Sequence, residues 1–172
     1  MKWVWVVVGL SALGAGCSSS NSSTAPDTSG RVELTVSPTA VGYAGGAGVG
    51  GAICRVPYIS RWGPFTWTLR ETNGAPVTIT SFTYSTFTNA GVQLSSDEII
   101  SATSRDFTGT AAPTIRIPAN GTITSRVVYD CELETNGVPN FGGGRAVSTV
   151  SGTDDSGAAV SSTATLTVLP PT

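Results

Sequence analysis

Apolar and polar residues alternate along several short segments of this chain. Every second position is apolar in residues 32–36 and again in residues 65–69. Because successive side chains of a strand point to opposite faces of a sheet, each segment is predicted to be a strand with one buried face. Similar reasoning predicts further strands at residues 91–94, 115–117, 122–133, 146–151 and 160–168. No segment has the period of a helix, and the run 95–101 is too short to predict one.

The segment after the second of these strands predicts a turn and then a bulge. Residues 71–76 read Glu-Thr-Asn-Gly-Ala-Pro, which favours a reversal of the chain into a new strand. In that strand the apolar positions change parity across Ser81, as a β-bulge would cause. Several short strands separated by Gly, Asn and Pro turns predict an all-β fold, a single antiparallel β-sandwich over residues 31–170.

The N-terminus has the organisation of an export signal. Lys2 precedes an apolar run at 3–13, which is followed by small residues at 14–16 and by Cys17. An eleven-residue helix is about 16 Å long and cannot span a hydrocarbon core of about 30 Å. Residues 1–16 are therefore predicted to be a signal peptide, and the Ser-rich residues 17–30 a flexible linker.

Cys17 resembles the acylated cysteine of bacterial lipoproteins, which implies attachment to a membrane through lipid. Such proteins usually carry leucine three residues before the cysteine, whereas Leu13 lies four before it. Gly14 and Gly16 also fit cleavage by ordinary signal peptidase, which would release a soluble secreted protein. The Ser-rich linker favours the lipid anchor, placing the protein at the outer membrane or cell surface.

Composition and charge exclude several functions. Charged residues make up 12% of the chain, histidine is absent, and Lys2 is the only lysine. Such a surface does not neutralise phosphates, so nucleic acid is not expected as a partner. Without histidine, a serine nucleophile lacks its usual base and transition metals lack their usual ligand. Residues 46–51 match GxGxxG, but no helix can begin at the following Cys-Arg-Val-Pro, so neither a nucleotide nor any other cofactor is expected.

Two cysteines remain once Cys17 is assigned to the anchor. In an oxidising compartment, Cys54 and Cys131 are expected to form a disulfide, which would close a loop of about eighty residues. The alternative is a pair of buried free thiols.

Acidic residues supply two candidate sites, each with a simpler alternative. Asp154 and Asp155 could bind calcium, although Asp-Asp-Ser-Gly between two strands is also an ordinary hairpin turn. The pair Asp97 and Glu98, or the group at 130, 132 and 134, could act as the acid and base of a hydrolase. Solvated strand charges are the more frequent arrangement, so no catalytic residue is assigned.

Residues 55–65 are the best candidate for a contact surface. Arg55, Tyr58, Arg61 and Trp62 lie close together here among prolines and a glycine. Aromatic and arginine side chains dominate recognition surfaces, and aromatic rings also stack on sugars. The alternative is that Trp62 is buried, because sandwiches commonly bury tryptophan.

Two predicted hairpins resemble those of immunoglobulin-like domains in bacterial envelope proteins. They are residues 150–157 with the strand 160–168, and residues 67–74 with 77–80. The resemblance implies a spacer, an adhesin module, a carbohydrate binder or an assembly part, and it transfers no catalytic residue. The expected function is therefore a non-catalytic, lipid-anchored envelope module that contacts another envelope protein or a surface glycan. A carbohydrate-binding module using Tyr58 and Trp62 is the first alternative, and a hydrolase using carboxylates alone is the second.

Overall fold

The structure is a computed structural model that describes residues 29–44, 59–127, 130–133 and 143–170. The predicted signal peptide, Cys17 and most of the predicted linker lie outside the described residues. The strands are β1 (Val32–Ser37), β2 (Ala40–Val41), β3 (Tyr43–Ala44), β4 (Ile59–Trp62), β5 (Phe65–Glu71), β6 (Val77–Thr88), β7 (Gln93–Glu98), β8 (Ile115–Ile117), β9 (Thr122–Val127), β10 (Asp130–Leu133), β11 (Gly144–Asp154) and β12 (Ala159–Val168), with helix α1 (Ile100–Thr108) between β7 and β8.

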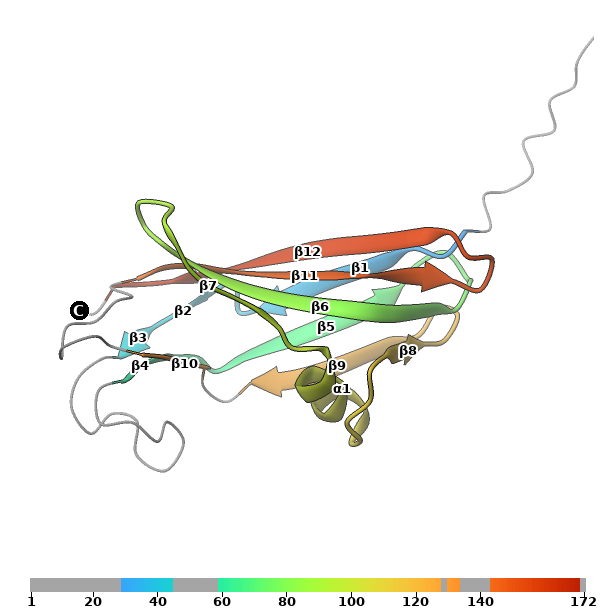
Figure 1. The fold of residues 1–172 in the computed structure, drawn as a ribbon, viewed down its shortest axis with the longest axis horizontal. Helices are drawn as coiled ribbons and strands as arrows, with labels where there is room; N and C mark the ends of the chain where they lie inside the picture. The colour runs from blue at the N-terminus through green and yellow to red at the C-terminus, as the bar shows by residue number, and fades with distance from the viewer. Residues whose placement is uncertain (1–28, 45–58, 128–129, 134–142, 171–172) are drawn as a thin grey trace, which may run out of the picture.

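The strands form two main sheets and one small one. The smaller main sheet has the order β1-β5-β9, and the larger has the order β2-β12-β11-β6-β7, with β8 also paired to β6 (Figure 1). Strands β10, β4 and β3 form the third sheet. These strand pairings are antiparallel, except that of β2 with β12, which is parallel. The chain leaves the smaller sheet at Ser37 and joins the larger at Ala40.

The core lies between the two main sheets and is built from the alternating apolar residues. Leu69 of β5 and Ile79, Phe82 and Val150 of β6 and β11 have no exposed surface. Trp67 lies at the centre of the aromatic contacts, with its ring centroid 4.9 Å from that of Phe82. The all-β class predicted from the sequence is confirmed.

The predicted bulge in β6 is confirmed. Ser151 of β11 pairs with Ser81 and Gly152 pairs with Ile79, so Thr80 has no partner in the register. This extra residue restores the inward direction of Phe82 and Tyr84. A Cβ on Gly152 would overlap the Thr78 carbonyl oxygen, so the close approach of the two strands requires glycine.

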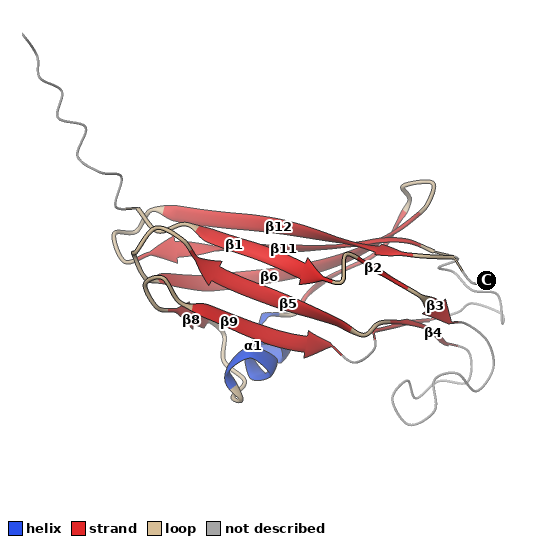
Figure 2. Cartoon of the chain, turned by 180° about the vertical axis from the view of Figure 1, so that it is seen from behind, coloured by secondary structure: helices blue, strands red, loops and turns tan. Residues whose placement is uncertain are grey.

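The prediction that no helix is present is wrong at α1, which packs on β9, β6 and β8 (Figure 2). Tertiary contacts override the weak local propensity here, because Ser104 is fully buried and its hydroxyl bonds to the carbonyl of Ala112 at 2.8 Å. Gly109 ends the helix with a φ of 80°. Within the described ranges, no helix combines the length and the apolar character needed to cross a bilayer.

Several strand boundaries also differ from the prediction, and the strand expected at 91–94 is β7, which runs from Gln93 to Glu98. The segment 122–133 is divided between β9 and β10, which belong to different sheets. Strand β11 runs over eleven residues, from Gly144 to Asp154, rather than over 146–151. For β11 the apolar pattern located the strand but not its ends, because the buried terminal positions are held by Gly144 and Asp154, which are not apolar.

Candidate functional site: a groove between two strand edges

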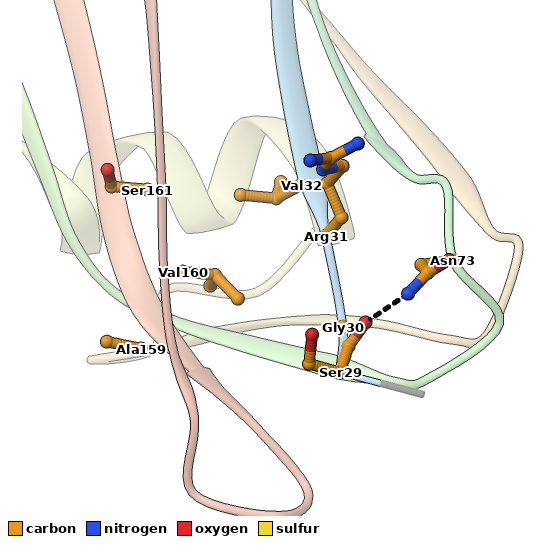
Figure 3. Close-up of a pocket in the computed structure, with 8 residues that line it drawn as sticks. All are labelled: Ser29, Gly30, Arg31, Val32, Asn73, Ala159, Val160 and Ser161. Atoms are coloured by element: carbon orange, nitrogen blue, oxygen red, sulfur yellow. Dashed lines mark hydrogen bonds between the residues drawn. The ribbon is translucent and has the colours of Figure 1, made fainter. Parts of the chain in front are cut away.

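An open groove of about 430 Å³ lies where the described chain begins (Figure 3). Residues from β1, from the β5–β6 turn and from β12 line it. They are Ser29, Gly30, Arg31, Val32, Asn73, Ala159, Val160 and Ser161. Val32 and Val160 are nearly buried, and Arg31 is the charged residue among those that line the groove.

The first half of β12 has no second strand in its own sheet, and β1 of the other main sheet lies beside it at this groove. The amides of Thr167 and Leu169 donate to Thr39 and Val41 on the β2 side, at 2.8 and 2.9 Å. Because backbone groups alternate in direction along a strand and β12 pairs with β11 without a register shift, the amide of Ser161 points the same way. Strand β2 reaches only Thr167 and Val168, and β1 lies beside the earlier part of β12.

The edge of β1 faces the same groove. The Arg31 carbonyl accepts from the amide of Thr72 at 3.0 Å, which directs the backbone of Arg31 toward β5. The backbone groups of Val32 and Leu34 therefore point away from β5. The amide of Leu34 donates to the Ser162 hydroxyl at 2.9 Å, and this bond ties β1 to β12 where the groove ends.

A buried carboxylate, Glu71, holds one side of the groove. Its oxygens accept from the amides of Arg31 at 3.3 Å, Asn73 at 2.7 Å, Gly74 at 2.8 Å and Asn120 at 2.7 Å. Burial alone would raise the pKa of Glu71, but the four backbone donors outweigh it and lower this pKa to about 2. The carboxylate thus stays ionised and fixes the β5–β6 turn against the start of β1.

A second carboxylate, Asp154, holds the other side of the groove. Its oxygens accept from the Ser156 hydroxyl at 2.6 Å and from the amides of Gly30, Ser156 and Ala158 at 2.7, 2.9 and 2.9 Å. The Ser156 hydroxyl first, and then the amide of Gly30, lower the pKa of Asp154 to about 2, with the other two amides, although burial opposes the change. Gly157 has a φ of 86°, so the predicted hairpin turn with a capping aspartate is confirmed.

Asp154 and Asp155 were the candidate calcium ligands, and both carboxylates already bind other groups of the protein. Asp155 forms a two-point ion pair with Arg116, with N–O distances of 2.6 and 2.7 Å. That contact lowers the pKa of Asp155. In the part of the chain that the structure describes, no three His, Cys, Asp or Glu side chains are grouped to hold a metal ion.

The prediction that Trp62 belongs to a contact surface is wrong. Its side chain is only 1% exposed, and the indole Nε1 donates to the Tyr84 hydroxyl at 3.2 Å. The flanking arginine, glycine and proline suggested a surface turn, but alternation in β4 directs the ring inward. Arg55 and Tyr58 lie outside the described residues, and for Arg61 the structure describes the backbone in β4.

The structure describes only some of the residues of the predicted disulfide and of the predicted acid–base groups. Cys54 lies outside the described residues, while the backbone of Cys131 lies in β10 opposite Arg61. Glu98 accepts from the Ser81 hydroxyl at 2.6 Å and the Phe82 amide at 2.8 Å. Although burial opposes the change, these contacts lower the pKa of Glu98, so this carboxylate fastens β7 to β6. Residues 130 and 132 lie in β10, where the structure describes only their backbone, and residue 134 lies outside.

The structural neighbours of this chain include two distantly related solved structures. The X-ray structure of Northeast Structural Genomics Consortium target SoR45 is 15% identical, with a TM-score of 0.49, over 86% of this chain and 91% of that chain. Pseudomonas fluorescens alkylpurine DNA glycosylase AlkC, bound to DNA containing an abasic site analog, is 13% identical with a TM-score of 0.36, over 80% of this chain and 30% of that chain. Both TM-scores lie below 0.5, so neither likeness indicates a function. No family model and no curated protein matches the sequence.

Proposed function

We propose that this protein is a non-catalytic, lipid-anchored immunoglobulin-like module of the bacterial envelope that contacts another envelope protein. The strand order supports the immunoglobulin-like part of the proposal. In such sandwiches the first, second and fifth strands share one sheet, and the third, sixth and seventh share the other. Here β1, β5 and β9 share one sheet, and β6, β11 and β12 share the other, with β7 extending it as an added strand.

The observation that carries the proposal is the chemistry of the groove. Its lining consists of strand edges, one guanidinium group, small polar residues and two valines. The two carboxylates behind it, Glu71 and Asp154, each accept four hydrogen bonds from the turns around them. Groups held in this way maintain a shape and are poorly placed to exchange protons with a substrate. The groove is therefore suited to binding.

A protein partner is favoured over a glycan. The glycan alternative used the rings of Tyr58 and Trp62 as a stacking surface, and the burial of Trp62 removes one of the two. The groove lining combines a guanidinium group, small polar residues and two valines, a mixture that suits the surface of a protein partner.

The proposal is tested by cross-linking the protein in intact cells and purifying it with its adducts. A reproducible protein adduct on residues of the β-domain is the expected result. Hydrolysis of envelope polymers by the purified protein, with a bell-shaped pH profile near neutrality, would overturn the non-catalytic assignment.

The anchor is tested by replacing Cys17 with serine. We expect this variant to leave the membrane fraction and to lose labelling by an alkyne fatty acid, because the acyl chains supply the strong apolar attachment. The wild-type protein is the control, and it should be labelled and sediment with membranes. Equal partition of the two proteins into the soluble fraction would show that the protein is secreted without lipid.

A further inference from the structure

Two Asn-Gly sequences lie in the turns around the carboxylate of Glu71. Asn73 and Gly74 belong to the β5–β6 turn, and Asn120 and Gly121 belong to the β8–β9 turn. Asparagine before glycine is prone to deamidation, because glycine has no side chain to hinder attack by its backbone nitrogen. Asn73, Gly74 and Asn120 are exposed, so water reaches both turns. Each turn is therefore a candidate for this modification.

Deamidation at Asn73 would proceed through a cyclic succinimide. The backbone nitrogen of Gly74 loses its proton and forms a bond with Cγ of Asn73. The bond from Cγ to Nδ2 breaks, and the side-chain nitrogen leaves as ammonia with the proton that Gly74 lost. Water then opens the ring at either carbonyl, which gives aspartate or isoaspartate. The Gly74 amide must therefore be free to lose its proton, and the Asn73 side chain must be free to turn toward it.

The structure restrains both of these groups. The amide of Gly74 donates to Oε2 of Glu71 at 2.8 Å. The side-chain Nδ2 of Asn73 donates to the carbonyl of Ser29 at 2.6 Å (Figure 3), and the backbone amide of Asn73 donates to Glu71 at 2.7 Å. The nucleophile is thus held in a charge-assisted hydrogen bond, and the side chain that it would attack is directed toward Ser29.

Glu71 is also unsuited to assist the first step. Its backbone donors lower its pKa to about 2, so near neutral pH the carboxylate is a poor base for the Gly74 proton. Its negative charge also disfavours the amide anion that Gly74 would have to form. The hydrogen bond and the charge therefore act in the same direction, against attack on Asn73.

The turn at Asn120 provides a comparison within the same molecule. The amide of Gly121 donates to the carbonyl of Pro118 at 2.8 Å, so the nucleophile of this turn is held by a neutral backbone group. Glu71 accepts from the amide of Asn120 itself and not from that of Gly121. Loss of the Glu71 charge should therefore affect the reaction at Asn73 much more than the reaction at Asn120.

We propose that Asn73 is a deamidation site that the carboxylate of Glu71 keeps unreactive in the folded protein. This inference goes beyond the proposed function, because it concerns the chemical lifetime of the turn beside the groove and not its partner. The product would carry a carboxylate in place of the Nδ2 group that donates to Ser29. The reaction would therefore remove a contact that holds the wall of the groove and add a second negative charge near Glu71.

The experiment incubates the full-length protein in detergent at mildly alkaline pH, with sucrose present to suppress global unfolding. Mass spectrometry of its peptides then measures aspartate and isoaspartate at Asn73 and Asn120. In the wild type, Asn73 should react at least about tenfold more slowly than in the same protein unfolded in guanidinium chloride. Glu71→Gln should raise the rate at Asn73 about tenfold, which corresponds to the loss of one hydrogen bond to a charged group. The rate at Asn120 should stay within about twofold of the wild type.

Trp62→Ala is the control for a general loss of stability. It removes a buried ring from the core and leaves Glu71 in place. Global unfolding frees both Asn-Gly turns together, so any increase in this variant should be similar at Asn73 and Asn120. In sucrose both of its rates should lie within about twofold of the wild type.

Three results would overturn the inference. The first is a wild-type Asn73 that reacts as fast in the folded protein as in guanidinium chloride. The second is an unchanged rate at Asn73 in Glu71→Gln. The third is an increase in Glu71→Gln that is equal at Asn73 and Asn120, or is matched by Trp62→Ala, because unfolding and not loss of the carboxylate would then control the reaction.

Discussion

Replacing Trp62 with alanine is expected to lower the free energy of unfolding by about 3–5 kcal/mol. The ring is 1% exposed and belongs to the core cluster that joins the two main sheets. Removing it leaves a cavity that the surrounding strands cannot fill, and it also removes the hydrogen bond to Tyr84. Urea denaturation of the purified full-length protein measures the change.

Tyr84→Phe is the matched control for this variant. It removes the hydroxyl that accepts from the Trp62 indole and keeps the ring that packs against Trp67. We expect a loss of about 1 kcal/mol, typical of one hydrogen bond. If Trp62→Ala costs no more than Tyr84→Phe, the tryptophan is a surface residue and the earlier assignment to a contact surface must be restored.

Replacing Glu71 with alanine is expected to lower the free energy of unfolding by about 2–4 kcal/mol. Four backbone amides lose their acceptor, and the turns that carry Asn73 and Asn120 lose the contact that joins them. Glu71→Gln tests the charge at nearly constant volume, and it should cost a similar amount because one amide nitrogen then faces donors. Urea denaturation at neutral pH measures both variants.

The pH dependence of the Glu71 effect follows from its pKa. Because the pKa of Glu71 in the folded protein, about 2, lies below the ordinary 4.5, its contribution is complete above about pH 5 and is lost as the pH falls toward 2. The difference in stability between the wild type and Glu71→Gln should therefore shrink over this range. Asp154, whose pKa is also about 2, should continue to make both proteins acid-sensitive. A difference between the two proteins that does not change with pH would contradict the assignment.

The sequence predicted those parts of the fold that depend on a buried face. Strands β1, β5 and β8 were located by alternation, and the change of parity at Ser81 located the bulge. Helix α1 was not predicted, because its buried positions include Thr103 and Ser104, which carry no hydrophobic periodicity. Its stability comes from packing on β6, β8 and β9, which local sequence does not reveal.

The groove could not be predicted from local sequence, because its sides are distant in the chain. Gly30 and Asp154 are separated by 124 positions, and the Asp-Asp-Ser-Gly sequence predicts the turn at Asp154 but not its contact with Gly30. One indication was present, since Glu71 continues the inward positions of Phe65, Trp67 and Leu69. A charged residue at an inward position, followed by an Asn-Gly turn, predicts a carboxylate that accepts from the turn amides.

The most direct test of recognition through the groove is amide hydrogen exchange, compared between the protein in native envelopes and the purified protein in detergent. The account predicts that Val32 and Ser161, at the beginning of β1 and β12, are protected in the envelope. The exposed apolar residues Val92 and Leu169 lie at the other end of the molecule, near the β6–β7 hairpin and the end of β12 (Figure 1), and they should exchange alike in the two samples. Protection confined to Val92 and Leu169, with Val32 and Ser161 unchanged, would contradict the account.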